Sequence, residues 1–365
     1  MLSFENRNLA QLHWPLVLVT TVIASLGVWN LASASRTMHQ PVWTSQLVWL
    51  GVGALVAAVL LRIDYRWLLT VAYPLYGVVL VLLVGVLVRG RTVMGARRWL
   101  DLGPVHMQPS ELAKIAVILA LARYFHEDEN DKGYTLTQLW LPGLLLLVPV
   151  ALIAKEPDLG TALVTLAIGA SIILFAKVRL SALITILVGT LGSAVAGWFW
   201  FFKAYQKKRV MTFLNPEGDA LGAGYHAMQS VIAVGSGQVT GKGWGEGTQN
   251  LLSFLPEQRT DFIFSVWAEE HGFVGGAVLI TLFAVLVLLG LDVADKARER
   301  FGAFLAVGVS ALFFWHAFIN IGMVTGVVPV VGVTLPLMSY GGSSVIVNLL
   351  GLGIVLNVSL RRFMF

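Results

Sequence analysis

The sequence has no cysteine and few charged residues. Of its 365 residues, 12% are charged and 57% are hydrophobic, whereas an ordinary soluble domain carries about 25% charged residues. A chain without cysteine forms no disulfide and no cysteine-ligated zinc site, and so little charge cannot cover a surface that faces water. These shortages exclude a soluble enzyme, a disulfide scaffold, a zinc-finger protein and a disordered chain, and they indicate that the lipid bilayer is the solvent.

Clustered positive charge is also scarce. The net charge is +5, but the Lys and Arg residues are scattered, and only Lys207-Lys208-Arg209 forms a dense basic group. Nucleic-acid binding needs a basic stripe or patch, so we exclude nucleic acid as a partner. We attribute the excess charge to orientation in the membrane and to anionic lipid headgroups.

Long apolar runs are what the sequence does contain. A helix needs about 20 apolar residues to cross a membrane. Ten such runs lie at 14–34, 46–62, 67–88, 110–125, 139–154, 158–176, 180–203, 262–290, 302–325 and 343–360. We therefore predict an all-α, polytopic membrane protein with a single domain and about ten transmembrane helices. An even number of helices places both termini on one side.

Basic residues in short loops indicate which side that is. Long loops cross the membrane largely regardless of charge, so the six Lys and Arg residues between 203 and 261 are left out of the comparison. Twelve basic residues then lie on the side of the termini and six on the other, which predicts cytoplasmic termini. The six omitted residues need another explanation, and an anionic substrate is one.

Two connections differ from the rest. Residues 204–261 form a large extracytoplasmic loop, and loops of this length are usually functional. Its glycine run 241–247 either brings backbone amides close to a phosphate or forms a flexible turn. Residues 326–342 carry no charge, are too apolar for water and contain too much Pro and Gly for a spanning helix, so we predict a re-entrant loop packed against protein.

A few ionisable residues lie within or beside the predicted spans, where such groups usually face a partner or a wet cavity. Glu111 and Lys114 are three residues apart and can pair on one helix face, either as a structural ion pair or at a functional site. Asp158 begins a span, where an acidic group also favours the helix dipole.

Asp261 lies where the large external loop meets a span. A carboxylate there can act as a base toward one group from water and another from lipid, or it can cap the helix that follows. His226, His271 and His316 lack the spacing of metal ligands, so no histidine metal site is expected.

Several motifs, in order along nearly the whole chain, resemble the SEDS family of polytopic membrane proteins, which act in the shape, elongation, division and sporulation of bacterial cells. They are Gly95-Ala-Arg-Arg-Trp-Leu-Asp-Leu-Gly103, Gln108-Pro-Ser-Glu-Leu-Ala-Lys114, Glu156-Pro-Asp-Leu-Gly-Thr161, Gly222-Ala-Gly-Tyr-His226, Leu255-Pro-Glu-Gln-Arg-Thr-Asp-Phe-Ile-Phe264, Asn320-Ile-Gly-Met323 and Leu335-Pro-Leu-Met-Ser-Tyr-Gly-Gly-Ser343. The runs that begin at Gly241 and Gly322 favour the elongation members over the division members.

The resemblance implies a peptidoglycan glycosyltransferase of the bacterial cytoplasmic (inner) membrane. It would join lipid II units through β-1,4 linkages into glycan strands and release undecaprenyl diphosphate. The residues that match the family's functional positions are Asp261 as the catalytic residue, Glu111, Lys114 and Asp158 in a central cavity, and Arg98 and Arg209 among the external basic residues.

This chemistry suits the residues present. A positioned carboxylate can take the proton of the attacking sugar hydroxyl. The leaving diphosphate needs cations, and Arg98, Arg209 and Lys242 lie on the predicted substrate side. A divalent cation, Mg²⁺ or Mn²⁺, could share that task, although no cofactor is required by the sequence.

The resemblance also implies partners: a class B penicillin-binding protein that crosslinks the new strands, other proteins of the elongation complex, lipid II, the nascent glycan and membrane lipid. The alternative functions are a lipid II flippase, which should depend on charges at the membrane midplane, and a division polymerase. A scaffold that only recruits a penicillin-binding protein would leave the buried carboxylates unexplained.

Overall fold

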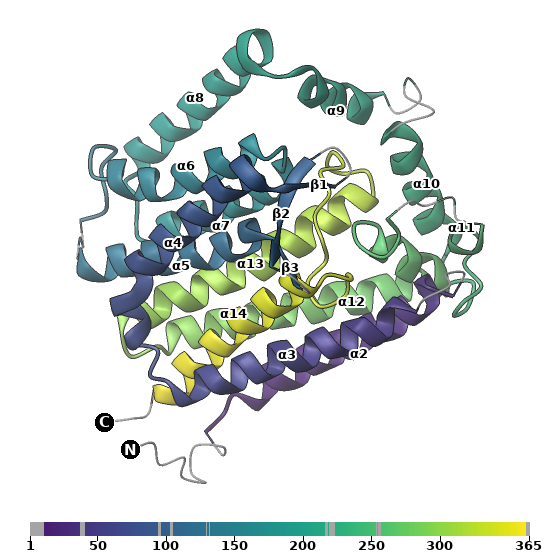
Figure 1. Cartoon of the computed structure of the whole chain (residues 1–365), viewed down its shortest axis with the longest axis horizontal. Helices are drawn as coiled ribbons and strands as arrows, with labels where there is room; N and C mark the ends of the chain where they lie inside the picture. The colour runs from purple at the N-terminus through teal and green to yellow at the C-terminus, as the bar shows by residue number, and fades with distance from the viewer. Residues whose placement is uncertain are drawn as a thin grey trace.

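The computed structural model describes residues 11–36, 41–93, 96–102, 105–128, 130, 132–215, 218, 223–252, 254 and 257–362. Helices dominate this part of the chain, which confirms the predicted polytopic helical fold (Figure 1). A helix lies at each of the ten predicted spans. They are α2 (Trp14–Ala34), α3 (Val42–Arg62), α4 (Trp67–Arg89), α5 (Pro109–Glu127), α6 (Trp140–Lys155), α7 (Leu159–Phe175), α8 (Leu180–Ala196) with the π-helical turn η1 (Gly197–Phe201), α12 (Ile263–Asp295), α13 (Arg300–Val324) and α14 (Gly342–Arg361).

Seven of the described helices are long and apolar enough to cross a membrane: α2, α3, α4, α8 with η1, α12, α13 and α14. Helices α6 and α7 are apolar but shorter, and α5 carries charged residues. Five motif residues, Gly95, Gly103, Gly222, Leu255 and Pro256, lie outside the described residues.

The centre of the bundle is formed by α5, α13 and α14. Most side chains of α5 are buried, including the small residues Ala113, Ala116 and Ala120, and small residues let membrane helices approach closely. Most of α13 and α14 is also buried, whereas α3 and α8 expose apolar side chains on most of their surface. The inner helices therefore carry the polar residues of the site, and the outer ones face the lipid.

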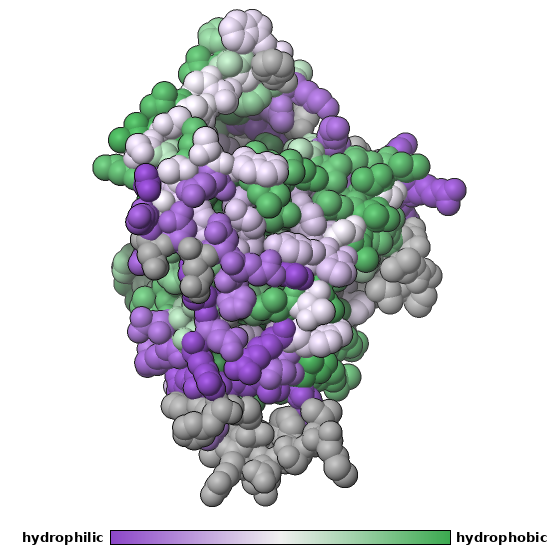
Figure 2. Space-filling model, turned by 90° about the vertical axis from the view of Figure 1, so that its left-hand side faces the viewer, coloured by the Kyte–Doolittle hydropathy of each residue, from purple (hydrophilic) through white to green (hydrophobic). Residues whose placement is uncertain are grey.

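Ion pairs gather at the end of the bundle that holds the short connections. Arg66 pairs with Glu299 at 2.8 Å, and Arg361 with Asp64 at 3.3 Å. Figure 2 looks onto this end and shows hydrophilic side chains across its middle with hydrophobic ones along its borders. His13, before α2, lies near Arg362, after α14, so both ends of the described chain lie on this face, as an even number of spans requires.

A small antiparallel sheet is an addition to the predicted all-helical fold. Strands β1 (Arg91–Val93), β2 (Ala96–Leu102) and β3 (Val105–Met107) pair in the order β1-β2-β3. The strands are only 3, 7 and 3 residues long, so hydropathy did not distinguish them from a loop. The sheet carries Arg98 toward the start of α5 and α7.

The large external connection contains three helices, α9 (Ala204–Leu214), α10 (Ala223–Ser236) and α11 (Thr248–Leu251). It also covers a break in α12, where Gly272 has φ 64° and ψ −162°. The carbonyls of Glu269 and Glu270 at this break accept hydrogen bonds from the backbone N–H groups of Lys242 (3.1 Å) and Gly243 (3.0 Å). The last carbonyls of the half-helix formed by residues 263–271 would otherwise lack hydrogen-bond donors, and the glycine run supplies them.

Residues 326–341 have no helix or strand and lie between α13 and α14. Leu335, Leu337 and Met338 are buried within the bundle. The backbone of this segment passes so close to α2 and α7 that a Cβ on Gly27 would lie 2.4 Å from the Leu337 carbonyl oxygen, and one on Gly160 would lie 2.6 Å from that of Val331. Because both positions are glycine, the backbone of the segment can pack directly against α2 and α7.

We predict that Gly241→Ala destabilises the protein by more than about 2 kcal/mol, because φ is +82° there and the added Cβ would lie 2.1 Å from the Glu270 carbonyl oxygen. The control is Gly189→Ala on α8, which has open space around its Cβ and should be neutral or slightly stabilising. Thermal melts of the purified proteins compare the two. Equal melting temperatures would contradict this description of the break.

Candidate active site

Asp261 lies just before α12, facing the segment 326–341. Its side chain is half-buried. A Cβ on Gly332 would lie 3.0 Å from Asp261 Oδ2, and Gly332 has φ +75°. Because residue 332 is glycine, no side chain from this position covers the carboxylate, which faces the backbone of the segment.

Hydrogen bonds fasten the backbone around Asp261 to the same segment. Asn320 Nδ2, on α13, donates to the carbonyl oxygens of Asp261 (2.8 Å) and Val333 (2.6 Å). Ser339 Oγ donates to the Thr260 carbonyl oxygen at 2.6 Å. Asn320 is fully buried, and our sequence analysis assigned it no role, although an asparagine in an apolar span was a usable signal.

The carboxylate of Asp261 is surrounded by groups that change its proton affinity. Its pKa is raised from 3.8 to about 6, mainly by burial and also by the nearby Glu257, although a hydrogen bond from Thr260 and the charge of Arg98 act in the opposite direction. A carboxylate with such a pKa is largely ionised at neutral pH and remains a useful proton acceptor.

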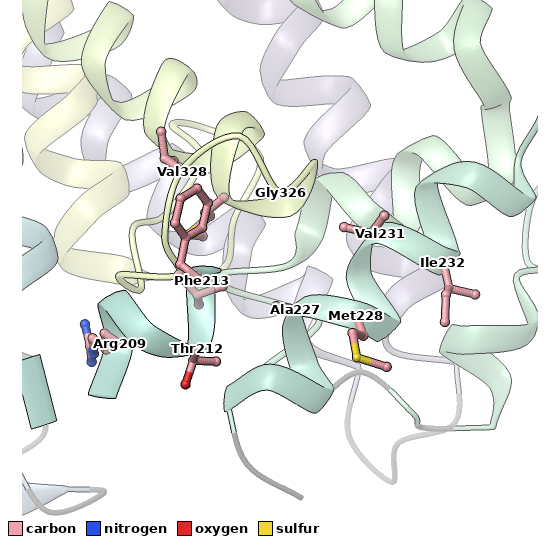
Figure 3. A pocket seen from close by; sticks show the side chains of 11 residues that line it. Arg209, Thr212, Phe213, Ala227, Met228, Val231, Ile232, Gly326 and Val328 are labelled. Carbon is pink, nitrogen blue, oxygen red and sulfur yellow. The ribbon is translucent and has the colours of Figure 1, made fainter. Parts of the chain in front are cut away.

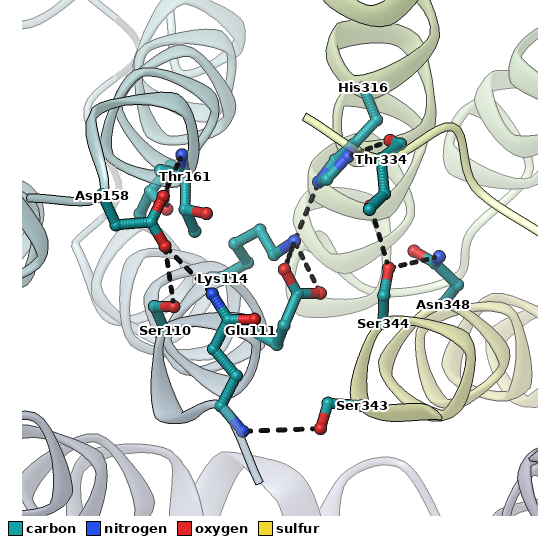
Figure 4. Close-up of polar contacts among 12 residues, drawn as sticks. Ser110, Glu111, Lys114, Asp158, Thr161, His316, Thr334, Ser343, Ser344 and Asn348 are labelled. Carbon is teal, nitrogen blue, oxygen red and sulfur yellow. Dashed lines mark hydrogen bonds and ion pairs between the residues drawn. The ribbon is translucent and has the colours of Figure 1, made fainter. Parts of the chain in front are cut away.

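Asp158 lies close enough to Asp261 to affect its pKa, and it caps α7. Its Oδ1 accepts a hydrogen bond from the Thr161 backbone N–H at 3.3 Å, and its Oδ2 accepts from Gln108 Nε2 at 2.9 Å and Ser110 Oγ at 3.4 Å (Figure 4). The predicted helix cap is therefore present, and the same carboxylate lies near Asp261.

Arg98 reaches the same region from strand β2. Its guanidinium donates through Nη2 to the Pro157 carbonyl oxygen, between Glu156 and Asp158. Arg98 also lowers the pKa of both Asp261 and Glu156 through its charge. The structure thus brings together three of the residues predicted from the sequence: Arg98, Asp158 and Asp261.

Glu156 is a residue of this region that the sequence analysis did not single out. It is fully buried, and neither carboxylate oxygen has a hydrogen-bond partner among the described residues. Burial, with a further contribution from Asp158, raises its pKa from 4.5 to about 8, although Arg98 opposes this. At neutral pH the carboxyl is therefore mostly protonated.

Glu111 and Lys114 form an ion pair, with Lys114 Nζ at 2.9 Å from both carboxylate oxygens. Lys114 Nζ also lies 2.8 Å from His316 Nε2 on α13 (Figure 4). The exposed fractions of Glu111, Lys114 and His316 are 5%, 0% and 2%. The predicted pairing is present, but these groups lie in a closed cluster and do not line an open cavity in this structure.

Arg209 lies in the wall of an external cavity of about 390 Å³ between α9, α10 and the start of the segment 326–341 (Figure 3). The lining is mainly apolar and includes Phe213, Met228, Val231 and Val328. Arg209 Nη1 lies 3.5 Å from the Val331 carbonyl oxygen, one residue before Gly332. The cavity thus adjoins the segment that contacts Asp261.

Lys242 forms an ion pair with a buried glutamate of α12. Its Nζ pairs with Glu269 Oε1 at 2.7 Å, about two helical turns along α12 from Asp261. The same carboxylate oxygen accepts hydrogen bonds from Thr248 Oγ1 (3.1 Å) and the Gln249 backbone N–H (3.2 Å). Lys242 therefore neutralises a buried glutamate and anchors the external connection, because an unpaired buried carboxylate would be costly.

Among the described residues, no group of three or more His, Cys, Asp or Glu side chains is placed to hold a metal ion.

Comparison with known proteins gives a consistent result. The family model for FtsW, RodA and SpoVE, described as a cell cycle protein, matches residues 9–363. The peptidoglycan glycosyltransferase MrdB of Escherichia coli (strain K12) is 42% identical over 354 residues, which span 96% of this chain and 93% of MrdB. The probable peptidoglycan glycosyltransferase FtsW of Trichlorobacter lovleyi is 40% identical over 367 residues, spanning 96% of this chain and 94% of FtsW.

Two solved structures are similar over nearly their whole length. A chain from work on the structural coordination of polymerization and crosslinking by a peptidoglycan synthase complex superimposes with a TM-score of 0.83 and 36% identity, covering 97% of this chain and 99% of that one. The crystal structure of the rod shape determining protein RodA of Thermus thermophilus has a TM-score of 0.72 and 33% identity, covering 97% and 98%.

We predict that Glu156→Gln makes the protein more stable than the wild type at pH 8 but not at pH 5. The folded-state pKa of Glu156 is raised from 4.5 to about 8, so the unfolded chain releases this proton at lower pH and the stability of the wild type falls as pH rises through that interval. Melting temperatures at the two pH values test this, with the exposed Glu246→Gln as control. A difference from wild type that does not change with pH would contradict it.

Proposed function

The chain belongs to the FtsW/RodA/SpoVE family of cell cycle proteins, and on this premise we propose how it works as a peptidoglycan glycosyltransferase of cell elongation. The family and the activity predicted from the SEDS motifs are confirmed by the relatives MrdB and RodA. The protein is a multi-pass protein of the bacterial inner membrane.

We propose that Asp261 is the general base in the polymerisation of lipid II. The acceptor sugar hydroxyl attacks the anomeric carbon of the donor, Asp261 takes the hydroxyl proton, and the bond to the diphosphate breaks with its electron pair leaving on the diphosphate. One carboxylate suffices, because a diphosphate is a weak base and leaves without a general acid. The half-buried position of Asp261, with a pKa of about 6, is the observation that carries this assignment.

Arg98 and Arg209 are the proposed partners of the diphosphate charge. Arg98 lies near Asp261, as its influence on the Asp261 pKa requires, and Arg209 contacts Val331 beside Gly332. Guanidinium groups bind phosphate oxygens through paired N–H donors, and cations that stabilise charge on a leaving group accelerate its departure. Lys242, which is bound to Glu269, has no part in this step.

The cavity beside Arg209 suits the lipid end of the substrate. Its wall is mainly apolar, with a guanidinium at its edge, which matches a polyprenyl chain joined to a diphosphate. This arrangement supports a donor that enters from the membrane with its diphosphate toward Arg209 and its sugar toward Asp261.

We propose a class B penicillin-binding protein as the partner, together with other proteins of the elongation complex. The support is the similarity to a chain of a peptidoglycan synthase complex that coordinates polymerization and crosslinking. A polymerase also explains the site better than a flippase does, because Glu111 and Lys114 are closed off from solvent, whereas Asp261 lies before a membrane helix on the external side that the sequence predicts.

Asp261→Ala should lower the rate of lipid II polymerisation by at least about 100-fold, because a general base contributes a factor of about 10² to 10⁴. The measurement is glycan formation by the purified protein with its penicillin-binding partner. Expression and partner binding should be retained. Glu246→Gln, which changes an exposed external carboxylate, should leave the rate unchanged. Polymerisation by Asp261→Ala at the wild-type rate would reject the assignment.

The pH dependence offers a separate prediction. Because the base must be ionised and the pKa of Asp261 is about 6, kcat/KM should be nearly constant above pH 7 and fall about tenfold per pH unit well below pH 6. Initial rates between pH 5 and 8 measure this limb, with a parallel check that the protein stays folded. A flat profile would mean that Asp261 is not the titrating base.

A further inference from the structure

The buried cluster of Glu111, Lys114 and His316 poses a question that the proposed chemistry leaves open. None of the three residues is more than 5% exposed, so none can touch a substrate in this structure. Any effect of the cluster on the reaction must therefore pass through other residues. The hydrogen bonds of the cluster connect it to the segment 326–341.

Lys114 has all three of its ammonium protons engaged, two with the oxygens of Glu111 and one with His316 Nε2. An ammonium group is only a donor, so His316 must accept at Nε2. Its proton is then on Nδ1, and Nδ1 lies 3.0 Å from the carbonyl oxygen of Thr334. The ion pair thus fixes one neutral tautomer of the imidazole, and that tautomer donates to the segment 326–341.

One helical turn further along α13, Asn320 binds the adjacent carbonyl of the same segment, that of Val333. Its amide donates to Val333 and also to Asp261. Helix α13 therefore holds two successive carbonyls, at residues 333 and 334, directly after Gly332, where an added Cβ would lie 3.0 Å from Asp261 Oδ2. The buried cluster and the proposed base are two ends of one hydrogen-bonded path.

We propose that His316 is a positioning residue, which Lys114 and Glu111 hold as the Nδ1–H tautomer so that it fixes the backbone of residues 332–334 against Asp261. The inference rests on the proposed role of Asp261 as the base. The Glu111–Lys114 pair would then act on the geometry around Asp261 from a distance, and it would not contact the substrate. His316 is then the residue through which that pair acts.

Two substitutions of similar size separate the two hydrogen bonds of His316. The amide nitrogen of an asparagine lies as many bonds from Cα as Nδ1, so His316→Asn can still donate to Thr334. The amide of a glutamine reaches the position of Nε2, so His316→Gln can still meet Lys114 but cannot donate to Thr334. We expect His316→Gln to lower kcat at least about 10-fold, because a displacement of about 1 Å can reduce a rate by 10²-fold, while KM for lipid II changes little. His316→Asn should stay within about threefold of wild type.

Amide hydrogen exchange of the segment 326–341, measured by mass spectrometry in lipid nanodiscs, gives a readout that needs no catalysis. Exchange at residues 332–335 should be faster in His316→Gln than in wild type, and close to wild type in His316→Asn. The control is Ser310→Ala, also buried on α13, whose hydroxyl donates within the helix to the Ala306 carbonyl oxygen at 2.7 Å. It should change neither the exchange nor kcat.

The tautomer is tested by ¹⁵N NMR of histidine-labelled protein, which has seven histidines. The His316 signals are those that disappear in His316→Asn. They should show a neutral ring with an unprotonated Nε2 in the wild type and lose that single tautomer in Lys114→Met. A protonated Nε2 in the wild type would overturn the inference.

Equal kcat and equal exchange in His316→Gln and His316→Asn would also overturn it. If Asp261→Ala polymerises lipid II normally, the proposed function fails, but the exchange and NMR measurements still decide whether His316 holds the segment.

Discussion

The site depends on a constraint set by α13, a buried helix that holds a non-helical segment inside a membrane protein. Backbone groups at that depth need partners within the protein, since lipid supplies none. Asn320 and His316 provide them for the carbonyls of residues 333 and 334, and Asn320 extends the same bond network to Asp261. The segment 326–341 can therefore reach the side chain of Asp261 without breaking the bundle.

The position of this segment also explains how the polar groups around Asp261 act together although most of them are buried. Asp158 caps α7 while Arg98 binds the carbonyl between Glu156 and Asp158, so the acidic residues and the guanidinium share one small region around Asp261. Burial, together with the nearby Glu257 and Asp158, raises the proton affinity of Asp261, and Arg98 keeps a cation beside it. A base and a site for leaving-group charge are the two requirements of the glycosyl transfer.

Much of the fold could be predicted from the sequence, because hydropathy is a local property. The ten apolar runs coincide with helices, and the uncharged stretch is irregular over residues 326–341, of which residues 335–339 are buried. The sheet at residues 91–107 and the break at Gly272 were not predicted. Both depend on partners distant in sequence or on one backbone conformation, and neither leaves a pattern in hydropathy.

The sequence by itself determined that the protein lies in the membrane, that Asp261 stands at a loop-to-helix junction and that Glu111 and Lys114 pair, because scarce charges and helical spacing are visible in one dimension. Only the tertiary structure decided which residues meet. It assigned Lys242 to Glu269, brought Glu156 into the region of Asp158 and Arg98, and joined Lys114 to His316 across 202 positions. Such pairings arise from the packing of helices that no local spacing specifies.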